Sequence, residues 1–149
     1  MQSIYQQDVT TALLKRIEAL GPDTKALWGK MNVSQMMTHC SMALEVASGK
    51  KKVKRVFIGR ILGPFIKPNY FSDKPFGKSS PTAPEFVVTD ARDFEKEKAR
   101  LIQEVKQFSS EGEAKCTTEP HAFFGPLTPQ QWGISMYKHL DHHLRQFGV

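Results

Sequence analysis

Four stretches of this sequence repeat apolar residues every three or four positions, which is the spacing of an amphipathic α-helix. Two of them open with the residue pattern of a reciprocal N-cap, in which Asn32 pairs with Gln35 and Thr128 pairs with Gln131. The four predicted helices run from Asp8 to Leu20, from Val33 to Ala47, from Thr89 or Asp90 to Gly112, and from Thr128 to Phe147. The sequence therefore predicts an all-α fold.

The connection between the second and third predicted helices is about 40 residues long, against roughly two to eight in a helical hairpin. It contains five prolines, which are Pro64, Pro68, Pro75, Pro81 and Pro84. A connection of this length can cross from one end of a bundle to the other, so the helices on either side of it can run parallel. We expect a four-helix bundle with a long crossover between helices 2 and 3. Within the crossover, residues 55–66 are predicted to form a short amphipathic helix and residues 80–84 an extended segment.

The positive charge of the chain is concentrated in this connection. Seven of the 21 Lys and Arg residues lie between positions 50 and 67, where there is no acid, and the rest of the chain is close to neutral. They are Lys50, Lys51, Lys52, Lys54, Arg55, Arg60 and Lys67. A protein that grips nucleic acid usually carries cations over much of its surface, so nucleic acid is not an expected partner. The basic segment is expected to lie outside the core, either as a solvated loop or as a surface that steers an anionic small molecule.

The length and composition are those of one domain, residues 1–149, with a basic, proline-rich insert at about residues 50–89. The apolar run from Val56 to Ile66 is broken by Arg60 and is too short to span a bilayer, so no membrane partner is expected. The start of the chain lacks the pattern of a secretory signal. Cys40 and Cys116 are predicted to be free thiols, which fits a cytoplasmic protein. The chain is expected to be a monomer or a homodimer.

Three of the five histidines lie in the last predicted helix. His139 and His143 are one turn apart and share the inward face of that helix, the spacing that lets two imidazoles bind one metal ion. A pair alone fits equally simple roles, such as two core-edge histidines bonded to backbone or water. The neighbouring Asp141 and His142 are predicted to lie on the surface and on the flank of the helix.

His39 is a candidate third ligand from another helix. It lies at the edge of the apolar face of the helix 33–47, where its ring can lean into a groove between helices. Three neutral imidazoles would leave a divalent ion its full charge and an open position, which is typical of catalytic sites. His121, on the loop before the last helix, is a possible site-lining residue or fourth ligand, with loop packing as the simpler interpretation. Trp132 and Met136, on the face of the histidine pair, are possible site-lining residues, and Cys40 is predicted to be a buried, unreactive thiol.

Several stretches of the sequence together resemble a bacterial domain-of-unknown-function family within the DinB-like superfamily of metalloenzymes. They are Trp28–Met31, Gln35–Cys40, Ser80–Phe86 and Tyr137–Gly148. The resemblance implies a four-helix bundle with a crossover between helices 2 and 3. It also implies a metal site built from one histidine of helix 2 and a His-x-x-x-His pair of helix 4, which by matching motif are His39, His139 and His143.

Members of that superfamily with assigned activities are thiol-dependent enzymes that use bacillithiol, mycothiol or glutathione together with zinc, nickel or a similar divalent ion. The resemblance therefore implies a metal-dependent S-transferase acting on a small electrophilic substrate, with a low-molecular-weight thiol held as the thiolate. Two alternatives stay open. One is a non-enzymatic helical bundle that binds an anionic partner through its basic insert, and the other is a metal-dependent hydrolase.

Overall fold

The computed structural model describes residues 1–78 and 82–149, and in these residues the protein is all-helical, without a β-strand. The elements are α1 (Gln7–Glu18), α2 (Val33–Ala47), α3 (Phe57–Tyr70), η1 (Pro84–Phe86), α4 (Phe94–Glu111), η2 (Glu113–Lys115) and α5 (Pro129–Gln146). None of the helices in the described residues has both the length and the apolar character needed to cross a bilayer.

The two helices with predicted capping boxes begin where the sequence places them. Asn32 Oδ1 accepts from the Gln35 backbone N–H at 2.9 Å, and Gln35 Oε1 accepts from the Asn32 backbone N–H at 3.0 Å. Thr128 and Gln131 make the same reciprocal pair at the start of α5, at 3.0 and 3.2 Å. Each pair satisfies two backbone donors that a helix start would otherwise leave unpaired. Both predicted N-termini are confirmed.

The predicted start of the helix before Gly112 is wrong. Its N-cap is Asp93, whose side chain accepts from the Lys96 backbone N–H at 2.7 Å, so α4 begins at Phe94 and not after Thr89 or Asp90. The residue at 90 is engaged elsewhere, because its carbonyl oxygen accepts from Gln35 Nε2 and holds this segment against α2. The first helix also ends earlier than predicted, at Glu18, although Leu20 beyond it is still buried in the core.

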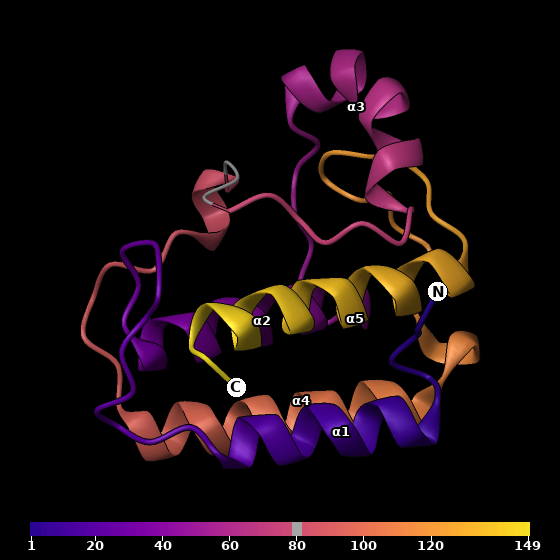
Figure 1. The fold of residues 1–149 in the computed structure, drawn as a ribbon. Coiled ribbons are helices and arrows are strands. Elements are labelled where there is room, and N and C mark those ends of the chain that lie inside the picture. Colours follow the sequence, from indigo (N-terminus) through magenta and orange to yellow (C-terminus); the bar gives the residue numbers. More distant parts are fainter. Residues whose placement is uncertain (79–81) are drawn as a thin grey trace.

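Four of the helices enclose one apolar core. α2 packs against α4 and α5, and α1 packs against the same two helices. Figure 1 shows α2 and α5 in one layer, with α1 and α4 in the layer below. Gln35, near the start of α2, donates to the carbonyl oxygen of Asp90, shortly before α4. Thr117, after α4, donates its N–H to Ala47 O at the end of α2. α2 and α4 therefore run in the same direction, and residues 48–93 connect the end of one to the start of the other (Figure 1).

The connection contains α3, which begins and ends later than the predicted 55–66. The helix continues to Tyr70 because Lys138 Nζ donates to the carbonyl oxygens of Tyr70 and Ser72, both at 2.6 Å, and so satisfies acceptors at its C-terminal end. Pro64 and Pro68 both lie inside the helix on its exposed side. In the segment expected to be extended, residues 80 and 81 lie outside the described residues, and Pro84 begins the 3₁₀ turn η1.

The inner side of α3 lies directly on the loop before α5. Gly59 and Gly63 are buried there, and a Cβ atom at either position would lie only 2.6 Å from the Phe123 carbonyl oxygen. The loop is closed by a bridge between His121 and Gly125. The spacing of the two glycines, one helical turn apart, therefore lets two backbones approach closely and fixes which face of α3 looks outward.

The sequence predicts that the basic segment lies outside the core, but one of its lysines pairs with a nearly buried carboxylate. Lys50 Nζ donates to both carboxylate oxygens of Glu104, at 2.8 and 2.7 Å, and to Gln107 Oε1 at 2.8 Å. Glu104 is only 8% exposed, so its charge depends on this partner. Lys54, by contrast, is exposed and has no salt bridge within the described part of the chain.

This difference gives a matched pair of variants. Lys50→Gln removes the counter-charge of a nearly buried carboxylate and should lower the free energy of unfolding by about 1–3 kcal/mol. Lys54→Gln removes the same charge from an exposed position and should change it by less than about 0.5 kcal/mol. Urea unfolding at neutral pH measures both, and equal midpoints for the two variants would contradict the structural role of Lys50.

Candidate metal centre

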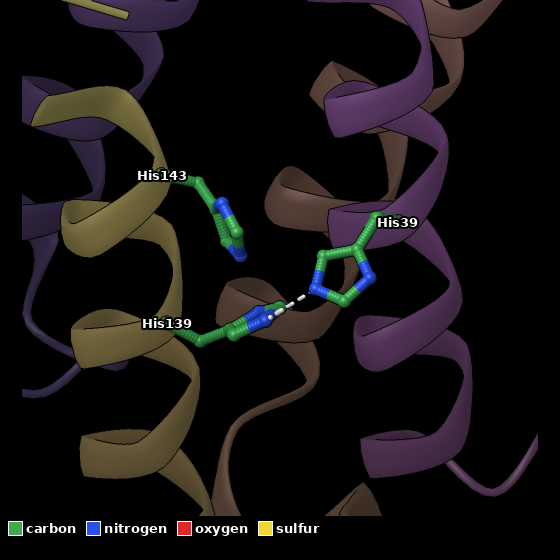
Figure 2. A group of neighbouring side chains, drawn as sticks. All are labelled: His39, His139 and His143. Atoms are coloured by element: carbon green, nitrogen blue, oxygen red, sulfur yellow. Dashed lines mark hydrogen bonds between the residues drawn. The ribbon is translucent and has the colours of Figure 1, made fainter. Parts of the chain in front are cut away.

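The structure brings the three predicted metal ligands together across the α2–α5 contact. His39 projects from the middle of α2, and His139 and His143 project from successive turns of α5 toward it (Figure 2). His39 Nε2 and His139 Nε2 are 2.9 Å apart, and one ring nitrogen of each of the three residues lies within 4.8 Å of the others. His39 and His143 are buried, and His139 is partly buried. Each histidine is predicted to point inward from its helix, and in the structure each points toward the opposite helix.

A backbone carbonyl orients the ring of His39. Its Nδ1 lies 2.9 Å from the carbonyl oxygen of Phe86 in η1, and because a carbonyl can only accept, Nδ1 carries the proton. The other ring nitrogen, Nε2, is left with its lone pair directed at the cluster. A histidine whose second nitrogen donates to a carbonyl is the usual arrangement around a bound metal, since it fixes both tautomer and ring orientation.

A side-chain amide does the same for His143. Gln146 Nε2 donates to the carbonyl oxygen of Trp28 at 2.7 Å, so the other amide atom, Oε1, must be the one that faces His143 Nδ1, at 2.8 Å. His143 Nδ1 therefore donates, and its Nε2 is free to act as a ligand. Gln146 is itself 4% exposed, which holds this relay in a single geometry.

The electrostatic surroundings keep all three rings neutral at pH 7. Burial lowers the pKa of His39 and lowers that of His139 well below its usual value. Burial, together with the nearby His39, lowers the pKa of His143 to about 3. Metal ions bind neutral imidazole, so no proton has to be displaced at neutral pH. A set of three neutral nitrogen donors, two of them with oriented lone pairs, fits zinc or nickel.

The possible site-lining residues lie deeper than the sequence suggested. Trp132 and Met136 are buried in the apolar core, and Trp132 Nε1 has no hydrogen-bond partner within the described residues. His121 stacks on Phe124, and its Nδ1 accepts from the backbone N–H groups of Phe123 and Phe124 at 3.1 and 3.2 Å. Its position is that of a loop anchor under α3, and it is not part of the three-histidine group.

Of the two neighbours of the histidine pair on α5, Asp141 is less exposed than predicted. Asp141 bridges helices, because it pairs with Arg16 of α1 at 2.8 Å and with Arg145 at 2.9 Å, so it is not a simple surface residue. His142 lies on the flank as expected, with its ring against those of Trp28 and His143.

Cys40 on α2 is fully enclosed, and its thiol faces Met36 Sδ. Burial raises the pKa of this thiol, in agreement with the predicted unreactive cysteine.

Two functional contacts were missed by sequence reasoning. Gln146 follows His143 by three positions on the same helix, a spacing that can be read from the sequence, but many glutamines have such neighbours without orienting them. The Phe86 carbonyl has no side-chain signature at all. Its position over His39 depends on the path of the whole connection from α2 to α4.

A family model with the description "Protein of unknown function (DUF1569)" matches residues 3–148. The chain belongs to the DUF1569 family. The match includes α2 and α5 in full, and hence all three histidines. No curated protein and no solved structure gives a significant match to this chain.

The first prediction for this DUF1569 domain concerns the metal. His139→Ala should lower the amount of zinc or nickel bound after purification and dialysis by about tenfold or more, because two ligands hold a metal much less well than three. His142→Ala removes an imidazole from the same helix but from outside the cluster, and should keep the wild-type content. Elemental analysis of protein made without a histidine tag measures both, and full occupancy of the His139→Ala protein would exclude the three-histidine site.

The second prediction concerns pH and His121. Burial, with Lys67 and Arg55 nearby, lowers the pKa of His121 to about 4, whereas the unfolded chain titrates near 6.5. As pH falls below about 6.5, the unfolded state therefore takes up a proton that the folded state refuses, and stability is lost at up to about 1 kcal/mol per pH unit. His121→Asn keeps an acceptor near the position of Nδ1 but cannot titrate. Urea unfolding between about pH 6.5 and pH 5 should show a shallower loss for this variant, and identical slopes would contradict the assignment.

Proposed function

We propose that this DUF1569 domain is a divalent-metal-dependent enzyme, in which His39, His139 and His143 hold zinc or nickel. The observation that carries the proposal is the convergence of three neutral imidazoles, with two of them oriented through carbonyl acceptors. Within the described residues the group includes no carboxylate and no thiolate. Three protein ligands with an open position are typical of catalytic zinc, whereas structural zinc is closed by four.

We further propose that the reaction joins a low-molecular-weight thiol to a small electrophile. A bound divalent ion would supply Lewis acidity that lowers the pKa of the thiol. In the reaction the thiol loses its proton, its sulfur forms a bond to an electrophilic carbon, and the leaving group departs with the electron pair of the bond that breaks. Both cysteines of the chain are poor nucleophiles, because burial raises the pKa of Cys40 and of Cys116. A thiol supplied from outside the chain fits this better than a protein nucleophile.

A surface pocket of about 700 Å³ beside α5 is suited to hold such a thiol. Its lining includes four cations, Lys74, Lys78, Lys138 and Arg145, against two acids, Asp73 and Asp141. Glutathione and bacillithiol carry carboxylates, which such a lining would attract. His142 forms part of the pocket wall, and the centre of its ring is 5.1 Å from that of His143, so the pocket adjoins the histidine group.

The fold supports a more specific proposal about ancestry. We propose that α1, α2, α4 and α5 correspond to the four-helix bundle of the DinB-like superfamily, and that residues 48–93 correspond to its crossover. The parallel course of α2 and α4 supports this, as does the placement of one histidine on α2 and two on α5. The two free cysteines agree with a cytoplasmic location for the enzyme.

Cobalt-substituted protein tests the thiol proposal. A sulfur ligand adds a charge-transfer absorption that water does not, so bacillithiol or glutathione should produce a new band. The apparent affinity should rise with pH because binding displaces the thiol proton, and it should level off where metal-bound water ionises. His139→Ala, exposed to the same cobalt and then dialysed, is the control and should give no band, because it retains little metal.

One result would replace the thiol proposal with another. If no thiol changes the spectrum while the histidines demonstrably hold cobalt, S-transfer should be abandoned. Metal-dependent hydrolysis would then be the better proposal, because the same three-ligand site can activate water.

A further inference from the structure

The outer side of α3 is an exposed apolar surface. Phe65 is 81% exposed and Phe57 is 73% exposed, values unusual for phenylalanine in a folded domain. Four more large apolar side chains of the same helix are at least 41% exposed, and these are Ile58, Ile61, Leu62 and Ile66. Figure 1 shows α3 standing outside the two layers of the other helices. A contiguous apolar surface of this kind is typical of an interaction site.

The outward orientation of these side chains is fixed by contacts on the other side of the helix. Gly59 and Gly63 lie against the backbone of Phe123, so α3 cannot rotate to bury its apolar face without separating from that loop. Its start is held by the bond from the Val56 N–H to Ala122 O. Its end is held by Tyr70, whose hydroxyl lies 2.7 Å from Ser135 Oγ. Both ends of α3 are therefore held by contacts with the rest of the fold. Its apolar face is directed to solvent, whereas a surface helix usually exposes its polar face.

The sequence that contains this helix carries charge of one sign. No acid occurs between Glu45 and Asp73 in the sequence, whereas seven cations do. Arg60, on the flank of α3, and Lys54, just before it, are exposed and have no salt bridge within residues 1–78 and 82–149. An apolar helical face flanked by unpaired cations is typical of helices that bind the surface of an anionic bilayer.

We propose that α3 is an interfacial anchor that lies on an anionic phospholipid surface, with Phe57, Ile61 and Phe65 inserted at the level of the acyl chains. A second copy of the chain suits this surface less well. A symmetric dimer through α3 would bring the same unpaired cations, Arg60 and Lys54, of both copies together. The expectation of no membrane partner rested on the absence of a spanning segment, and a helix lying in the interface needs none. The proposal does not depend on the metal site.

Vesicle flotation tests the anchor directly. The full chain should bind vesicles of phosphatidylcholine containing about a quarter phosphatidylserine, and should bind pure phosphatidylcholine much more weakly. Ile61→Ser and Phe65→Ser should each weaken binding by roughly tenfold, because each removes one inserted side chain. Leu27→Ser is the matched control, since Leu27 is 69% exposed but lies away from α3, and it should bind like the wild type.

The charge is tested separately. Lys54→Gln combined with Arg60→Gln should weaken binding to the anionic vesicles and make it less sensitive to salt. All substituted side chains are exposed, so metal content and helical circular dichroism should stay at wild-type values and verify that each variant is folded. Equal binding by Phe65→Ser and the wild type, or equal binding to neutral and anionic vesicles, would overturn the proposal. A concentration-dependent dimer that Phe65→Ser abolishes, with no vesicle binding, would overturn it in favour of a second copy.

Discussion

Because α2 and α4 run in the same direction, the chain between them has to return along the molecule, and this return path positions much of the rest. Near its end it lays η1 over α2, where the Phe86 carbonyl fixes the ring of His39. Near its middle it places α3 on the loop before α5, and at Tyr70 it meets Ser135 of α5 itself. A short hairpin between α2 and α4 would give neither contact. The connection is thus part of the candidate site as well as a link between helices.

The histidine group also depends on polar contacts that reach the other loops. Gln146 joins His143 to the Trp28 carbonyl, and so ties the segment between α1 and α2 to the candidate metal centre. Each group in this series of hydrogen bonds has a single possible donor or acceptor role. The Trp28 carbonyl can only accept, which determines the orientation of the Gln146 amide and then the tautomer of His143. Buried polar groups linked in this way hold ring positions that apolar packing alone would leave free to rotate.

The molecule presents two chemically different features on separate elements. The three histidines lie between α2 and α5 (Figure 2), whereas α3 stands outside the two layers of helices (Figure 1) and its large apolar side chains are exposed. The end of α3 is held against the helix that carries two of the histidines, because Lys138 on α5 donates to the carbonyl oxygen of Tyr70. An enzyme anchored through α3 would therefore hold its metal centre at a fixed distance from the surface to which it binds.

The helices whose ends depend on local contacts could be predicted from the sequence. Capping residues such as Asn32 and Thr128 act within one turn, and the apolar spacing of α2 and α5 selects which side of each helix faces inward, so the inward direction of all three histidines could be predicted. The tertiary structure decided everything that depends on partners distant in the sequence. Gln35 holds Asp90 against α2, so α4 begins only at Phe94; Lys50 is the counter-charge of Glu104; and His121 lies against Tyr70 of α3. Each of these depends on a neighbour that no local pattern specifies. The outward face of α3 belongs to the same class, since its apolar pattern predicts a helix, but only the close approach of Gly59 and Gly63 to Phe123 determines which side is left exposed.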